Sequence, residues 1–120
     1  MPGQISVAEL ARLLAAAATG AGVSPAPPPL LLDVRQPWEN ELAKLAGSLL
    51  VPLPELDERW PEVAEAQGQP ERLIVAYCHH GVRSLSAAAI LEGQGVGPVV
   101  SLAGGIDAWS RVVEPALPRY

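Results

Sequence analysis

One continuous stretch, residues 73–91, constrains the fold of this 120-residue chain more than any other. It opens with the apolar run LIVAY, passes through the single cysteine of the chain, Cys78, and ends in the alanine-rich run SAAAIL. The unbroken apolar run predicts a strand covered on both faces, and the alanine-rich run predicts a helix. A buried strand that leads through a short loop into a helix is the half-unit of an α/β fold, and ligands bind at the carboxyl ends of such strands.

The rest of the chain repeats this alternation. Apolar runs that predict strands lie at residues 4–5, 30–34, 47–51 and 98–102. Helical patterns lie at residues 7–18, 54–66, 83–91 and 106–112, and a short helix opens at residue 37. The connections are too long for hairpins, which predicts parallel strands joined by right-handed crossovers, with helices on both faces of the sheet. We expect Pro61 to interrupt the 54–66 helix. The proline-rich residues 19–29 predict a surface loop, and residues 114–120 an extended tail packed on the surface.

Composition narrows the classes of function. The net charge is −5 and no cluster of basic residues could follow a phosphate backbone, so nucleic acid is not an expected partner. One cysteine excludes an intramolecular disulfide and a multi-thiolate metal site. The adjacent His79 and His80 have no nearby third ligand, so no metal or cofactor is expected. No apolar run reaches the roughly 18–20 residues that span a bilayer, and no basic leader opens the chain, so we expect a cytoplasmic protein without a membrane partner.

The loop after the predicted strand at residues 73–77 combines a candidate nucleophile with an anion-binding backbone. Cys78 lies just before a helix start, where unpaired N–H groups and the helix dipole favour a thiolate. Gly81 permits a tight turn, so that several N–H groups can point inward around an anion. We expect Cys78 to be partly exposed at the bottom of a shallow pocket.

Further motifs recur in a fixed order along nearly the whole chain. They are LDVR at residues 32–35, WE at 38–39, GS at 47–48, CHHGVRS at 78–84 and LAGGIDAW at 102–109. In this order they resemble the rhodanese-like domain family, specifically the small single-domain thiosulfate sulfurtransferases. The resemblance implies one rhodanese-like α/β domain over residues 1–120, with a parallel sheet of about five strands and helices on both faces.

The resemblance also implies an activity. Sulfane sulfur would pass from thiosulfate or a persulfide to Cys78, and from there to cyanide, a small thiol, thioredoxin or a sulfur-acceptor protein, without a cofactor. The loop from Cys78 through Arg83 has six residues, one fewer than in the related cell-cycle phosphatases, and the shorter loop suits a sulfane sulfur. Two alternatives stay open: a sulfur-relay or binding module that acts mainly on a protein partner and, less favoured, a phosphatase or arsenate reductase.

Most of the expected site residues lie in the loop at residues 78–84. The expected substrate-binding residues are His79, His80, Gly81, Val82, Arg83 and Ser84, and the expected supporting residues are Asp33 and Arg35. The histidines are expected to supply loop backbone and to line the entrance, and either could instead act in acid–base chemistry. Arg83 either attracts an anionic donor or pairs with an acidic residue such as Asp33. Ser84 is expected at the helix start, with its hydroxyl able to hydrogen-bond toward the sulfur.

Overall fold

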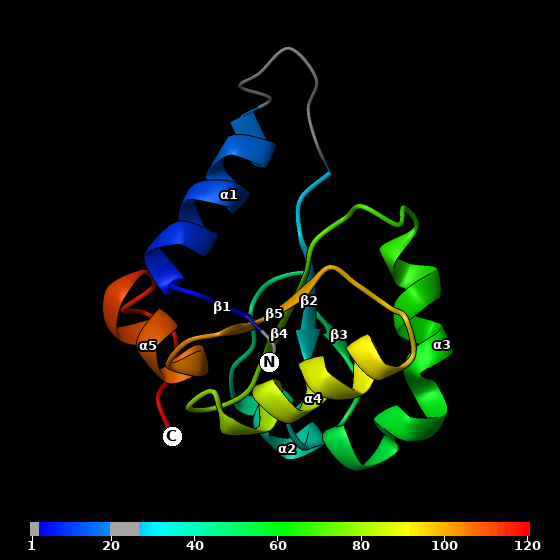
Figure 1. Cartoon of the computed structure of the whole chain (residues 1–120). Coiled ribbons are helices and arrows are strands. Elements are labelled where there is room, and N and C mark those ends of the chain that lie inside the picture. The colour runs from blue at the N-terminus through cyan, green and yellow to red at the C-terminus, as the bar shows by residue number, and fades with distance from the viewer. Residues whose placement is uncertain (1–2, 20–26) are drawn as a thin grey trace.

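The computed structural model describes residues 3–19 and 27–120, and in it a five-stranded sheet lies between two layers of helices (Figure 1). The strands are β1 (Gly3–Ile5), β2 (Leu30–Asp33), β3 (Leu49–Leu50), β4 (Ile74–Tyr77) and β5 (Val99–Leu102). Their order is β1-β5-β4-β2-β3, and every neighbouring pair is parallel. The predicted α/β class is therefore confirmed, with β4 at the centre and β2 beside it. Residues 20–26 of the predicted surface loop lie outside the described residues.

Two pairs of helices cover the two faces of the sheet (Figure 1). The helical elements are α1 (Val7–Thr19), α2 (Pro37–Leu42), the 3₁₀ turn η1 (Leu53–Glu55), α3 (Leu56–Gln67), α4 (Val82–Gly93) and α5 (Gly105–Val112). The core on one face gathers buried side chains of α3 and α4, and the core on the other face gathers those of α1 and α5. None of the helices in the described part of the chain is both long and apolar enough to cross a membrane.

The two central strands supply both cores in alternation, because successive side chains of a strand point to opposite faces. Ile74 and Ala76 of β4 pack toward α3 and α4, whereas Val75 and Tyr77 pack toward α1 and α5. All four β4 residues are fully buried. This double burial is the reason for the unbroken apolar run in the sequence.

The prediction that Pro61 interrupts its helix was wrong. Pro61 lies inside α3, which runs from Leu56 to Gln67 without a break, and the change of geometry comes earlier, where η1 passes into α3. Proline removes one hydrogen bond, to the carbonyl four residues before it. Pro61 and Asp57 both lie on the exposed side of α3, so water can bind the Asp57 carbonyl. A proline at a solvent-facing position therefore does not end this helix.

Candidate functional site

The cysteine loop begins at the carboxyl end of the central strand β4. Cys78 follows Tyr77 directly, and α4 starts four residues later with Gly81 as its N-cap, in the left-handed conformation at φ 103°. The Gly81 N–H donates a hydrogen bond to Cys78 Sγ at 3.0 Å, and Ser84 Oγ lies 3.5 Å from the same sulfur. The sulfur thus faces the first turn of α4, and the prediction that Ser84 points toward it is confirmed.

The expectation that Cys78 is partly exposed was wrong, because its exposed fraction is 1%. Cys78 extends the alternation of Ile74 and Ala76 by one more step, so its side chain packs into the core on the α3 and α4 face. Val82, the first residue of α4, is in contrast 74% exposed. The loop therefore holds the Cys78 thiol beneath its surface, with the apolar Val82 side chain on the outside.

A second hydroxyl supports the sulfur from β5. The hydroxyl oxygens of Ser84 and Ser101 are 2.6 Å apart, and Ser101 Oγ also lies 3.5 Å from the Gly81 carbonyl oxygen. Both serines are buried. Sequence reasoning missed Ser101, since one serine inside an apolar strand gives no sign of which residue it will meet on a neighbouring element.

The start of α5 holds the backbone of the cysteine loop. The Ile106 N–H donates to the Cys78 carbonyl at 2.8 Å, and the Asp107 N–H donates to the His79 carbonyl at 3.1 Å. Gly105 lies where a Cβ atom would overlap the Cys78 and His79 carbonyl oxygens, and its φ is +61°. Only glycine fits this approach, so Gly105 of the LAGGIDAW motif allows α5 to bind the backbone of the cysteine loop.

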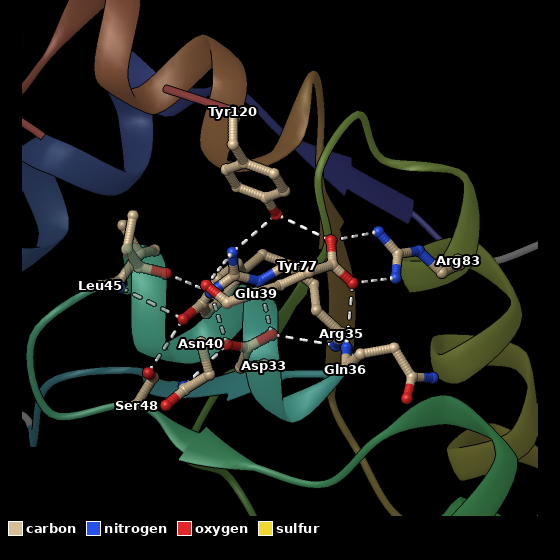
Figure 2. Close-up of polar contacts among 11 residues, drawn as sticks. Asp33, Arg35, Gln36, Glu39, Asn40, Leu45, Ser48, Tyr77, Arg83 and Tyr120 are labelled. Atoms are coloured by element: carbon tan, nitrogen blue, oxygen red, sulfur yellow. Dashed lines mark hydrogen bonds and ion pairs between the residues drawn. The ribbon is translucent and has the colours of Figure 1, made fainter. Parts of the chain in front are cut away.

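Arg83 pairs with an acidic residue, as one of the two expected alternatives has it, but that residue is Glu39 of α2 and not Asp33, the residue given as an example. Arg83 Nη1 and Nη2 donate to Glu39 Oε1 and Oε2 at 2.7 and 2.9 Å (Figure 2). The Glu39 side chain is 4% exposed and the Arg83 side chain 35%. The ion pair therefore links α2 to α4, two helices that meet at the cysteine loop.

Asp33 and Arg35 form a second ion pair, fully buried at the end of β2. Arg35 Nε and Nη2 donate to the two Asp33 oxygens at 2.8 and 2.7 Å, and Asn40 Nδ2 donates to Asp33 Oδ2 at 2.9 Å. Arg35 also donates to the carbonyls of Glu39 and Ala43. Burial lowers the pKa of Arg35, but the hydrogen bonds with Asp33 and Tyr120 raise it by more than burial lowers it. The pKa of Arg35 therefore lies above its ordinary value.

Tyr120, at the end of the chain, enters this network (Figure 2). Its hydroxyl accepts from Arg35 Nη1 at 2.7 Å and donates to Glu39 Oε2 at 2.8 Å. Its ring stacks on His79, with centroids 4.2 Å apart, and His79 in turn stacks on His80 at 4.1 Å. The tail therefore does more than cover the surface, and sequence reasoning missed this contact between the tail and the loop.

These contacts shift the acid–base behaviour of three groups. Hydrogen bonds from Arg83 hold the pKa of Glu39 down at about 2 despite the burial of the carboxylate. Burial, followed by the neighbouring His80, lowers the pKa of His79. Burial raises the pKa of Tyr120 to about 12. Glu39 is therefore ionised and Tyr120 protonated at neutral pH. Within residues 3–19 and 27–120, no group of three or more His, Cys, Asp or Glu side chains is placed to hold a metal ion.

Comparison with known proteins places this geometry in a family. The family model described as "Rhodanese-like domain" matches residues 6–112. A sulfurtransferase from Allochromatium vinosum is 38% identical over 82 residues, which cover 68% of this chain and 72% of that protein. The Arabidopsis thaliana rhodanese-like/PpiC domain-containing protein 12 is 37% identical over 90 residues, which cover 75% of this chain but 30% of that longer protein. The solved structure of the human single-domain sulfurtransferase TSTD1 superposes with a TM-score of 0.71 at 26% identity, over 93% of this chain and 97% of that one.

Proposed function

The chain belongs to the rhodanese-like domain family, and on that premise we propose that it is a sulfurtransferase that carries sulfane sulfur on Cys78. The donor is thiosulfate or a related persulfide, and the acceptor is an external thiophile. One observation carries the proposal: Cys78 Sγ accepts the Gly81 N–H at 3.0 Å at the start of α4. That position gives the sulfur a hydrogen-bond donor and the positive end of a helix dipole, and both favour an anionic sulfur. The names of sulfurtransferases among the relatives support the same reaction class.

The first half-reaction loads the cysteine. The Cys78 thiolate attacks the terminal sulfur of thiosulfate, a new S–S bond forms, and the original S–S bond breaks. Sulfite leaves with the electron pair of the broken bond, and Cys78 becomes a persulfide. Backbone N–H groups at the start of α4 are suited to stabilise the terminal sulfur anion, in the way that an oxyanion hole stabilises a developing negative charge.

The second half-reaction empties the cysteine. A nucleophile such as cyanide or a thiolate attacks the outer sulfur of the persulfide, and Cys78 leaves as a thiolate with the electron pair. The sequence has a single cysteine, so this chain has no second thiol that could release the sulfur from Cys78 by forming an internal disulfide. The acceptor is therefore external, and a small thiol, thioredoxin or a sulfur-acceptor protein has the required chemistry. A covalent intermediate predicts ping-pong kinetics.

The test is to isolate the loaded protein. The chain is incubated with thiosulfate, freed of donor, and weighed by intact-protein mass spectrometry. We expect a gain of one sulfur atom that cyanide or a thiol removes, and we expect no gain in Cys78→Ser, because a hydroxyl cannot carry sulfane sulfur. Initial-rate plots that intersect, together with failure to recover a loaded protein, would show that the reaction does not pass through Cys78.

A further inference from the structure

The positive charge of Arg83 is neutralised by another residue of the chain, Glu39. Arg83 lies in the first turn of α4, two residues after Gly81, whose N–H Cys78 Sγ accepts, so a free guanidinium there would attract an anionic donor. Both terminal nitrogens of Arg83 instead donate to Glu39, at 2.7 and 2.9 Å. Paired hydrogen bonds of this kind fix the orientation of an arginine as well as cancelling its charge.

Glu39 is built into the protein as a permanent anion. Its Oε1 also accepts the Gln36 N–H at 3.0 Å, and its Oε2 also accepts the Tyr120 hydroxyl at 2.8 Å. The Tyr120 hydroxyl is itself held by Arg35 at 2.7 Å. Because four hydrogen bonds reach a carboxylate that is 4% exposed, Glu39 stays both charged and in place at neutral pH.

Two other groups near the loop, Arg35 and His79, add little positive charge at neutral pH. The guanidinium of Arg35 is matched by the Asp33 carboxylate, with both side chains fully buried. The pKa of His79 lies below its ordinary value, because burial and the adjacent His80 oppose protonation. A donor that approaches Cys78 therefore meets backbone dipoles but little net positive charge from these side chains.

Resting on the sulfurtransferase function proposed above, we propose that Glu39 is a specificity-determining residue: by neutralising Arg83 it makes the site favour sulfane donors with one negative charge over dianionic donors of the same size. Thiosulfate carries two negative charges. Methanethiosulfonate replaces one oxygen anion of thiosulfate with a methyl group and carries one. Each donor transfers its terminal sulfur to the Cys78 thiolate, and the electron pair of the broken S–S bond leaves on sulfite or on methanesulfinate. The two donors therefore differ mainly in charge.

The experiment compares the two donors on Glu39→Gln and on the unaltered protein. The measured quantity is kcat/KM for thiosulfate divided by kcat/KM for methanethiosulfonate, because this ratio cancels any general change in Cys78 reactivity. The amide of Glu39→Gln can still accept the Gln36 N–H and donate to the Tyr120 oxygen, but it no longer carries the charge that cancels Arg83. We expect the ratio to rise about tenfold, which corresponds to about 1.4 kcal/mol.

Two further variants control for other effects. Glu62→Gln removes the same charge from an exposed pair with Arg59 on α3, away from the loop, and we expect its ratio to equal that of the unaltered protein. Combining Glu39→Gln with Arg83→Met should return the ratio toward the unaltered value, because no guanidinium remains to be exposed. A ratio that stays within twofold in Glu39→Gln, or that stays high in the double variant, overturns the inference.

The unaltered protein supplies a test that does not depend on folding of a variant. If Arg83 is neutralised, added salt should not weaken the reaction with thiosulfate, since there is no attraction for salt to screen. A fall of fivefold or more in kcat/KM for thiosulfate between about 10 and 200 mM salt, with methanethiosulfonate unaffected, overturns the inference. If neither donor loads sulfur on Cys78, the proposed function fails and this inference fails with it; if both donors load, the ratio and the salt response judge the inference alone.

Discussion

Arg35→Met tests whether the buried ion pair beneath the loop stabilises the fold. The variant keeps much of the apolar stem of Arg35 but removes its guanidinium, which makes two hydrogen bonds to Asp33 and one to Tyr120. Asp33, fully buried, would keep the Asn40 side chain and the backbone N–H of residue 35 as donors but would lose its counter-charge. Removing one partner of a buried pair typically costs about 3–5 kcal/mol, a large part of the roughly 5–15 kcal/mol that stabilises an ordinary domain.

The assay is urea unfolding followed by far-ultraviolet circular dichroism, with thermal unfolding as a second measurement. At about 4 °C per kcal/mol for a chain of this size, the melting temperature should fall by about 12–20 °C. Arg59→Met is the matched control, because Arg59 also makes paired contacts with carboxylates but its side chain on α3 is 33% exposed, and pairs at the surface often contribute nothing measurable. A loss below about 1 kcal/mol in Arg35→Met, or equal losses in the two variants, would refute the reasoning from burial.

Three further predictions concern the loop and its supports. Gly105→Ala should destabilise the protein and reduce sulfur loading, because the added Cβ overlaps the Cys78 and His79 carbonyl oxygens. Gly93→Ala, in α4 with open space around it, should instead stabilise the folded protein by about 0.5–1 kcal/mol; parallel urea titrations and mass spectra test both expectations. The pKa of Glu39 is lowered from an ordinary 4.5 to about 2, so its carboxylate stabilises the fold above pH 4.5 and this stabilisation is lost as the pH falls toward 2. In Glu39→Gln the free energy of unfolding should therefore fall less steeply between pH 4.5 and 2, and an unchanged slope contradicts this. His79→Ala and His80→Ala should each keep substantial thiosulfate:cyanide turnover if the rings only line the loop, and a loss as deep as in Cys78→Ser would give that histidine a chemical role.

The strands and the cysteine loop were predictable because their signals are local. The apolar run before Cys78 is continuous since both faces of β4 are covered, and a continuous run is visible without knowing what covers it. The turn at Gly81 and the start of α4 lie within a few residues of the sulfur. Interactions of this range depend on spacing in the sequence, so the sequence is enough to predict them.

The partners of the loop were not predictable because they depend on how distant elements pack. Arg83 has acidic residues before it in the chain at both positions 33 and 39, and only the placement of α2 beside α4 selects Glu39. Ser101 and Tyr120 reach the site from β5 and from the tail. Neither residue stands at a sequence spacing from the cysteine loop that would predict the contact. The burial of Cys78 was missed for a related reason: the strand alternation continues one residue past β4, under the first turn of α4.

The orientation of the cysteine loop is set from outside the strand–loop–helix unit that contains it. In a trans peptide group the carbonyl of one residue and the N–H of the next point in opposite directions. The described chain has its one cis bond elsewhere, between Gly97 and Pro98. Because α5 binds the Cys78 and His79 carbonyls, the N–H groups of His79 and His80 must point away from α5. The following N–H, that of Gly81, already reaches the sulfur. The first turn of α5 therefore fixes which side of the loop presents donors to an anion, and a change at Gly105 should alter the chemistry of Cys78 without touching its side chain.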